Sequence, residues 1–182
     1  MTFRKDELLR ALKNGEKFHY VFFWGHRSFE GTVGPSCCSQ WFEAGFDVDG
    51  NSYPTAEHFM MAEKARLFSD QEMLARILEC RSPSEAKSFG RKVKGFDNEI
   101  WTSNCYEIVV RGNVQKFSQN PRLAHWLLST EPAVLVEASP TDPIWGIGVH
   151  HDDPASRDPF KWPGQNLLGF ALMKVRGILL GS

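Results

Sequence analysis

Residues 53–65, YPTAEHFMMAEKA, are the most informative segment of this chain. Pro54 followed by Thr55 predicts a helix start with Thr55 as the N-cap. Glu57 and Lys64 lie seven residues apart, almost two turns, and therefore share one face of that helix. Because the residues between them are largely apolar, we expect the helix to be mostly buried.

The acid of this segment falls in the first helical turn, where exposed backbone N–H groups hold a carboxylate ionised. A helix start directed at a cleft would present Glu57 to a substrate. An acid and a lysine two turns apart are also common on solvated helices without any chemical role. Both interpretations stay open from the segment alone.

The length and composition predict one globular domain spanning residues 1–182, with 42% hydrophobic residues supplying its core. The formal net charge of -1 excludes a strongly basic surface that neutralises phosphates, and leaves room for a local basic pocket. No apolar run reaches the length of a membrane span, and residues 1–15 resemble an amphipathic helix rather than a signal peptide. We expect a soluble cytoplasmic protein.

Neither the cysteines nor the histidines form a strong metal-binding motif. No C-x-x-C spacing links Cys37, Cys38, Cys80 and Cys105, which favours reduced thiols over a zinc site. The sequence HHDD at 150–153 has metal-ligand chemistry, but the surrounding Asp, Pro and Ser residues favour a solvated loop. We therefore expect neither a metal nor a cofactor.

Helices dominate the predicted organisation, with a few short β-strands. Strands are predicted over 17–24, within 40–53 and over 133–139. Capping boxes at Ser69 and Ser82 predict helices beginning near 70 and 83. Others are expected over 1–14, 97–117 with a possible break at Gly112, 121–129, and after Asn166. The polar loop at 150–164 has the length of a lid or binding loop.

A second constellation lies in EASPTDPIWGIG, residues 137–148. Glycines let a backbone approach a ligand closely, and Trp145 can stack on a base or sugar. Turn formation accounts for Asp, Pro and Gly equally well, and tryptophan is more often a core residue. A binding role and a structural role both remain open.

Five motifs, in this order, resemble the NADAR family, which includes the YbiA-like N-glycosidases: YPTAEHFMMAEKA, SPSEAKSFGRKV, QKFSQN, LVEASPTDPIWGIG and GQNLLGFALMKVR. The resemblance covers about residues 18–180. It implies a single, mainly α, YbiA-like helical domain with a few short strands, which acts on N-glycosidic bonds of ribose derivatives.

The resemblance implies two activities. One branch hydrolyses phosphoribosylated pyrimidine and pyrimidinedione intermediates of riboflavin biosynthesis and releases ribose 5-phosphate, and this is the activity we expect. The alternative branch removes ADP-ribose from guanine in nucleic acid, which the net charge of -1 mildly disfavours. A non-catalytic module that binds ADP-ribose or a nucleotide is a third possibility, against which the retained Glu57, Lys64 and Asp142 argue.

Position by position, the family's functional residues correspond to Glu57, Lys64, Trp101, Asp142, Trp145 and Gly146. The chain departs from the family where S-N-F is replaced by Ser39, Gln40 and Trp41. It also has Met61 where the family has glutamine, which removes an amide that could read a base or a sugar. These departures concern the substrate rather than the reaction.

Cleavage of a ribosyl C–N bond develops positive charge on the sugar, which Glu57 and Asp142 are suited to stabilise. Lys64 has a further possible role in forming a Schiff base, which needs a neutral amine. Lowering a lysine pKa by about 3 units costs roughly 4 kcal/mol, which a domain stable by about 5–15 kcal/mol tolerates. A close ion pair between Glu57 and Lys64 would oppose this role.

Other substrate contacts are predicted for an arginine and three tryptophans. Arg91, next to Lys92, has the planar fork that suits phosphate, although a solvated helix end is an equally good interpretation. The heterocycle is expected to stack on one of three rings, Trp24, Trp41 and Trp101, of which the resemblance favours Trp101.

Overall fold

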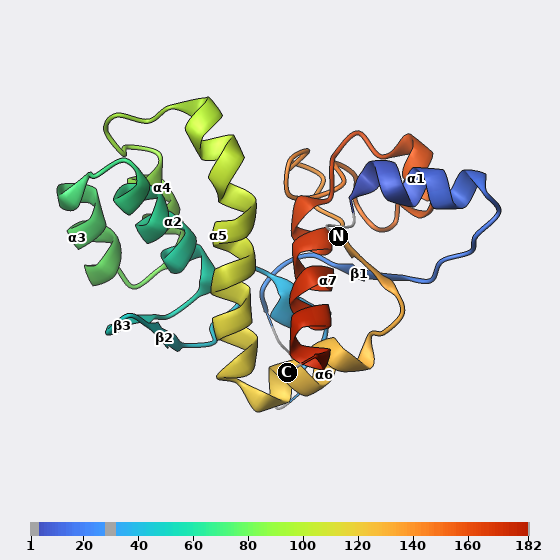
Figure 1. Ribbon diagram of the computed structural model, residues 1–182, viewed down its shortest axis with the longest axis horizontal. Helices are drawn as coiled ribbons and strands as arrows, with labels where there is room; N and C mark the ends of the chain where they lie inside the picture. The colour runs from blue at the N-terminus through green and yellow to red at the C-terminus, as the bar shows by residue number, and fades with distance from the viewer. Residues whose placement is uncertain (1–3, 28–31, 182) are drawn as a thin grey trace. The chain divides into compact units, whose positions relative to one another are not determined.

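The computed structural model describes residues 4–27 and 32–181, and helices predominate in them (Figure 1). The chain is divided into two compact units: a central unit, Gln40–Pro121, and a terminal unit, Met1–Ser39 with Arg122–Ser182. The mainly α prediction with a few short strands is confirmed. No helix in the described segments is long and apolar enough to span a membrane. That residues 1–182 form a single domain stays a prediction.

The central unit contains β2 (Phe46–Val48), β3 (Asn51–Tyr53), α2 (Ala56–Leu67), α3 (Gln71–Glu79), α4 (Pro83–Gly90) and α5 (Asn98–Ser118). The terminal unit contains α1 (Lys5–Lys13), β1 (Tyr20–Phe23), the 3-10 helix η1 (Pro35–Cys38), β4 (Val134–Glu137), the 3-10 helices η2 (Pro154–Arg157) and η3 (Pro159–Lys161), and α7 (Leu167–Leu180). Helix α6 (Pro121–Ser129) begins at the boundary.

Helix α2 is the centre of its unit, because α3, α4 and α5 all pack against it (Figure 1). The Thr55 hydroxyl accepts the backbone N–H of His58 as the predicted N-cap. Eight of the twelve residues of α2 are buried, so the prediction of a mostly buried helix is confirmed. The preceding hairpin of β2 and β3 turns at Asp49 and Gly50, both with positive φ.

Two glycines allow α2 to approach its neighbours closely. A Cβ on Gly90 would lie 2.1 Å from the Met61 sulfur, and one on Gly112 would lie 2.5 Å from Cδ1 of Phe59. The expected break at Gly112 is therefore wrong: α5 runs continuously, and the missing side chain makes room for a ring. Met61 is 7% exposed and fills the contact with α4, so its thioether serves packing.

The predicted helix starts are confirmed where their signals are local. Ser82 forms its capping box with Glu85, and Asp97 caps α5 through the N–H groups of Glu99 and Ile100. The capping box at Ser69 is wrong, because the N-cap of α3 is Asp70. Ser69 has φ 57°. The Asp70 carboxylate accepts from Met73 N at 3.1 Å and from Lys94 N at 2.8 Å.

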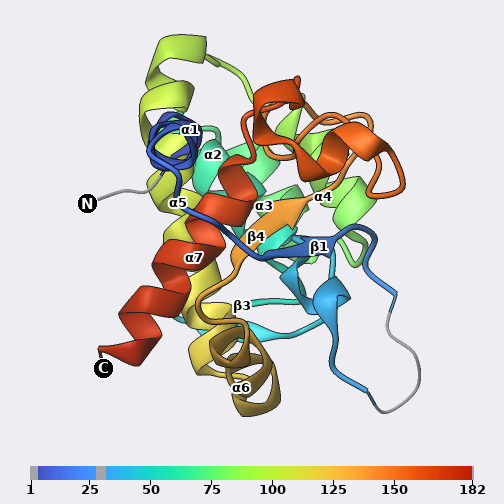
Figure 2. The same cartoon turned by 90° about the vertical axis from the view of Figure 1, so that its right-hand side faces the viewer.

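The terminal unit is built on a parallel pair of strands, in which β1 lies beside β4 with Tyr20 opposite Val134 (Figure 2). Helix α7 packs against β4. The core of the unit includes Leu8, Val136 and Phe170, each at most 1% exposed. The predicted strand at 133–139 is confirmed as β4, and three of its four residues are buried.

Asn166 joins the start of α7 to the end of β4. It occupies the expected N-cap position with φ 56°, but its side chain does not cap the helix. Its Nδ2 donates to the Leu135 carbonyl at 2.8 Å, and its Oδ1 accepts from Glu137 N at 2.9 Å. A Cβ on Gly169 would lie within 2.6 Å of both amide atoms and 2.1 Å from the Leu135 oxygen, so the helix approaches the strand only because this residue is glycine.

Candidate active site

The ammonium group of Lys64 lies in an aromatic environment. Its Nζ is 4.2 Å from the centre of the Phe96 ring and 5.4 Å from that of Trp101. Among residues 4–27 and 32–181, no carboxylate lies within ion-pair distance of this nitrogen. Burial lowers the pKa of Lys64 below its ordinary value. The ion pair with Glu57 that would have opposed an amine role is thus not formed.

Glu57 begins α2 and is almost fully enclosed, with 5% of its surface exposed. Its backbone N–H donates to the Gln40 carbonyl at 2.9 Å. The Gln40 side chain is held in turn, because its Oε1 accepts from Nδ2 of Asn113 on α5 at 2.8 Å. The segment that departs from the family's S-N-F is therefore fixed against both helices, next to the acid.

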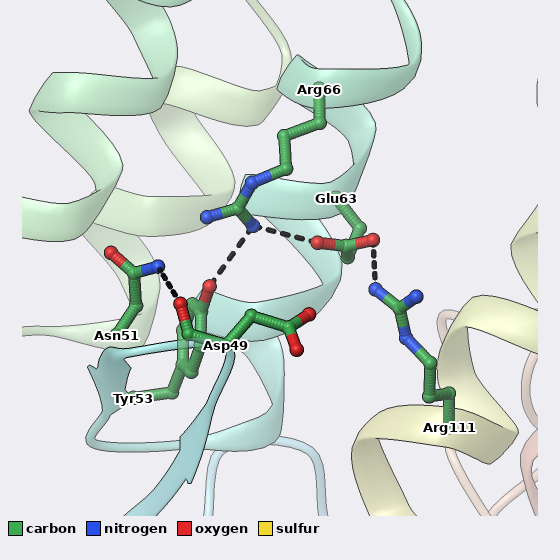
Figure 3. Close-up of polar contacts among 6 residues, drawn as sticks. All are labelled: Asp49, Asn51, Tyr53, Glu63, Arg66 and Arg111. Atoms are coloured by element: carbon green, nitrogen blue, oxygen red, sulfur yellow. Dashed lines mark hydrogen bonds and ion pairs between the residues drawn. The ribbon is translucent and has the colours of Figure 1, made fainter.

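A different acid of α2 supplies the ion pairs of this helix (Figure 3). Glu63 accepts from Arg66 at 2.6 Å and also pairs with Arg111 on α5. Arg66 donates to the Tyr53 hydroxyl at 2.9 Å, and the Arg111 guanidinium lies 5.1 Å from the centre of the Phe59 ring. This network, which the sequence analysis missed, joins α2 to α5 and β3 and leaves Lys64 out of it.

His58, next to the acid, has a structural role. It is 1% exposed, and its Nδ1 lies 2.8 Å from the Thr55 hydroxyl. Burial lowers the pKa of His58, and the opposing effects of the Cys80 backbone and the Glu85 charge are smaller. The imidazole is therefore neutral near pH 7 and stabilises the start of α2.

Trp41 and Arg91, two of the predicted substrate contacts, also lie in the central unit. The Lys87 Nζ is 5.8 Å from the centre of the Trp41 ring. Arg91 follows the last turn of α4 with its side chain exposed, and it has no acidic partner in the described part of the chain. A phosphate contact by Arg91 and stacking by Trp41 stay predictions.

In the terminal unit, Asp142 shapes the loop that follows β4. Its Oδ1 accepts from the backbone N–H of Ile144 at 2.9 Å and of Trp145 at 2.8 Å. Its Oδ2 has no hydrogen bond from the described residues. One carboxylate oxygen therefore fixes the turn, and the other is available to a ligand.

Gly146 is required by packing. A Cβ at this position would lie 2.8 Å from the Glu137 carbonyl oxygen and 3.0 Å from that of Asp142. Its own carbonyl accepts from Asn166 N at 3.0 Å. Close approach of a substrate to Gly146 stays a prediction, while the close approach of β4 is observed.

Trp24 directly follows β1 and is 53% exposed. Its ring meets that of His150 edge-on, with centroids 5.0 Å apart. A cavity of about 180 Å³ beside them is lined by Phe22, Phe23, Trp24, Pro35 and His151. An exposed indole at a cavity is suited to stacking, so the sequence prediction for Trp24 is retained as a prediction.

The structure brings together some of the predicted site residues within each unit. The central unit holds Trp41, Glu57, Lys64, Arg91 and Trp101, and the terminal unit holds Trp24, Asp142, Trp145 and Gly146. Of these, Lys64 and Trp101 are in contact, as are Asp142 and Trp145. Phe96 was missed, although an apolar residue directly before the helix cap Asp97 is a recognisable signal.

Comparison with known proteins identifies relatives over most of the chain. It is 43% identical to N-glycosidase R617 of Acanthamoeba polyphaga mimivirus, over 86% of this chain and 94% of that protein. It is 35% identical to the chloroplastic riboflavin biosynthesis protein PYRR of Zea mays, over 72% of this chain but 20% of that protein. The NMR structure of Escherichia coli YbiA matches 91% of this chain and 87% of its own with a TM-score of 0.69 and 27% identity.

The chain thus shares its fold and much of its sequence with a class of proteins whose named members include N-glycosidases. The NADAR domain model matches residues 22–180. The chain belongs to the NADAR family and has the YbiA fold.

Proposed function

We propose that this protein hydrolyses the ribosyl C–N bond of phosphoribosylated pyrimidine intermediates of riboflavin biosynthesis and releases ribose 5-phosphate. It is an enzyme, a hydrolase acting on N-glycosyl compounds, as its family membership and its similarity to R617 and YbiA indicate. The riboflavin substrate is supported by the similarity to PYRR. No disulfide joins the four cysteines, all of which lie in described segments, and this supports a reducing, cytoplasmic location.

The observation that carries the proposed chemistry is the environment of Lys64. An amine acts as a nucleophile only when it is neutral, and desolvation favours the neutral form. The rings of Phe96 and Trp101 lie beside the half-buried Nζ, and no acid of the described residues offsets its partial loss of water. Such a lysine is suited to covalent catalysis.

In the proposed reaction the sugar of the glycosylamine opens to an iminium at C1, with a proton going to the ring oxygen. The Lys64 amine adds to C1, and a proton moves from Nζ to the pyrimidine nitrogen. That nitrogen leaves with the electron pair of its bond to C1, and a protonated Schiff base to Lys64 remains. Water adds to C1, the bond to Nζ breaks, and ribose 5-phosphate and the free lysine are formed.

Glu57 has the electrostatic role in this scheme. A buried carboxylate stabilises positive charge on C1 more strongly than an exposed one, because the local dielectric constant is low. Glu57 is 5% exposed and stands in the first turn of α2, where the helix dipole favours its ionised form. Asp142 is the second proposed carboxylate.

The test measures ribose 5-phosphate released from the phosphoribosylamino-pyrimidine by the wild type and by Glu57→Gln. We expect turnover to fall by on the order of 10²–10³. Glu99→Gln is the matched control, since Glu99 is a first-turn acid of α5 that is exposed to solvent. Full activity of Glu57→Gln would remove the acid from the mechanism.

A parallel assay uses an ADP-ribosylated guanine oligonucleotide. Release of ADP-ribose from it, with no release of ribose 5-phosphate from the small substrate, would overturn the proposed substrate in favour of modified nucleic acid. Tight binding of ADP-ribose without any product from either substrate would instead identify a non-catalytic binding module.

A further inference from the structure

His150, His151 and Asp152 bring three metal-binding groups to one point of the loop after β4. His150 Nδ1 lies 3.3 Å from Asp152 Oδ2, and His151 Nε2 lies 3.1 Å from Asp152 Oδ1. One ligand atom from each of the three side chains falls within 4.8 Å of the others. The sequence predicts a solvated loop here, because adjacency in the sequence does not show whether neighbouring side chains converge.

These separations are those of ligands around a small divalent ion. Zinc binds imidazole nitrogen and carboxylate oxygen at about 2.0–2.2 Å in a tetrahedral arrangement. Two ligands at that distance and at the tetrahedral angle are about 3.3–3.6 Å apart. The distance from His150 to Asp152 Oδ2, 3.3 Å, matches this spacing, and the distance from His151 to Asp152 Oδ1, 3.1 Å, is slightly shorter. Because the two distances run to different oxygens, a rotation of the carboxylate or of one imidazole is needed for a single oxygen to bind the ion with both nitrogens.

Hydrogen bonds from buried side chains fix the loop that carries the three residues. The Ser156 hydroxyl donates to the His151 carbonyl at 2.9 Å, and the indole N–H of Trp162 donates to the Ser156 carbonyl at 2.7 Å. Ser156 and Trp162 are both buried, at 0% and 3% exposure. The backbone that carries the cluster is thus fixed by the core of the terminal unit, which lowers the entropy cost of binding an ion.

The rings are also oriented. Trp24 contacts the His150 ring edge-on at 5.0 Å, and the Asp152 backbone N–H makes a long 3.4 Å contact to His150 Nδ1. The neighbouring Asp153 is the N-cap of η2, and its Oδ1 accepts from Ala155 N at 2.8 Å.

We propose that His150, His151 and Asp152 form a binding site for a first-row divalent transition metal, with Zn²⁺ as the best match. Two imidazoles and one carboxylate favour Zn²⁺, Cu²⁺ or Ni²⁺ over Mg²⁺ and Ca²⁺, which prefer oxygen ligands. Three protein ligands leave a fourth tetrahedral position for water or a ligand oxygen. The site adjoins Trp24, a predicted stacking residue, and metal binding to it is measured without substrate.

The test is a titration of the metal-free full-length protein with Zn²⁺ in competition with a chromophoric chelator. We expect one zinc per chain at this site, and at least a tenfold weaker affinity in His151→Ala and in Asp152→Asn. His125→Ala is the matched control, because His125 is exposed on α6 and lies outside the cluster. Circular dichroism of each variant establishes that it is folded.

A second readout uses Co²⁺, whose visible absorption reports tetrahedral coordination. The wild type and His125→Ala should give the intense tetrahedral bands, and the two cluster variants should lose them. Equal zinc affinity in all four proteins, or zinc binding abolished by His125→Ala and kept by His151→Ala, would overturn the proposal. Retention of Mg²⁺ in place of Zn²⁺ would overturn the assignment of the metal class.

Discussion

The Nζ atom of Lys64 lies 4.2 Å from the centre of the Phe96 ring, although the two residues belong to different segments of the central unit. Phe96 directly precedes Asp97, the N-cap of α5. The position of the ring is thus fixed by the start of one helix and that of the amine by another. An aromatic face attracts the protonated amine, whereas burial lowers the pKa of Lys64, so the contact and the burial act in opposite directions on the charge of this amine.

The first prediction separates a nucleophilic lysine from a merely cationic one. Lys64→Arg keeps the positive charge and the aromatic contact but has no amine to attack C1. We expect it to lose at least 10²-fold in turnover, and borohydride to trap a covalent sugar adduct on the wild type alone. Activity near that of the wild type in Lys64→Arg would show that charge suffices.

The second prediction concerns stability and pH. Because burial lowers the pKa of Lys64 in the folded chain, the unfolded chain binds the proton more tightly between the two pKa values. Stability therefore rises as the pH increases through the folded pKa, and the full penalty is present below it. Lys64→Met should raise the free energy of unfolding at pH 7 by about 0.5–1 kcal/mol.

Urea unfolding of both proteins at pH 7 and pH 10 measures this effect. The advantage of Lys64→Met should shrink at the higher pH, where a larger fraction of this lysine is neutral in the folded chain than in the unfolded chain. A difference that does not change with pH would show that the gain comes from packing of the methionine.

The third prediction uses two helical glycines. Gly112→Ala places a Cβ 2.5 Å from the Phe59 ring and should destabilise the protein by about 1–3 kcal/mol. Gly177→Ala in α7 has no atom within 4 Å of its new Cβ and should stabilise by about 0.5–1 kcal/mol. Thermal melts compare the two variants, and destabilisation by both would indicate a general intolerance of α-helical substitution.

The fourth prediction separates the charge of Asp142 from its role in the turn. Asp142→Asn keeps an oxygen that accepts the N–H groups of Ile144 and Trp145, whereas Asp142→Ala keeps none. We expect both to lose activity, and only Asp142→Ala to lower the melting temperature, by the equivalent of about 1 kcal/mol. An active Asp142→Asn would assign this carboxylate to structure.

The fifth prediction tests the amide that joins α7 to β4. Asn166→Ala leaves the Leu135 carbonyl and the Glu137 N–H without partners in a buried position, and alanine fits poorly at φ 56°. We expect destabilisation of about 3 kcal/mol. Asn166→Asp keeps only the acceptor and should be intermediate, whereas equal loss in both would point to the backbone conformation as the cause.

Local signals in the sequence predicted much of the fold. Thr55, Ser82 and Asp97 cap their helices because each reaches an N–H only two or three residues ahead. Asp70 rather than Ser69 is the N-cap of α3. The Asp70 carboxylate also accepts a hydrogen bond from Lys94 N, a contact between distant residues that no local pattern reveals. Gly112 was interpreted through helix propensity, and the Phe59 ring that explains it comes from another helix.

The candidate site was less accessible from the sequence. Glu57 and Lys64 were identified through the resemblance to the NADAR family. The resemblance did not indicate that a third residue of the same helix, Glu63, forms ion pairs with Arg66 and Arg111. Arg111 lies far from Glu63 in the sequence, so this pairing follows only from the packing of α5 on α2. The geometry of His150 and its neighbours likewise depends on how the loop folds over Trp162.

The pairing of Tyr20 with Val134 has a consequence for biosynthesis. All residues of the central unit, Gln40–Pro121, are translated before β4, the strand that pairs with β1. The aromatic segment of β1 therefore lacks its partner strand while the helices around α2 assemble. We expect a released fragment that ends near residue 125 to protect the central helices from protease and to leave the segment of β1 open to cleavage and to chaperones.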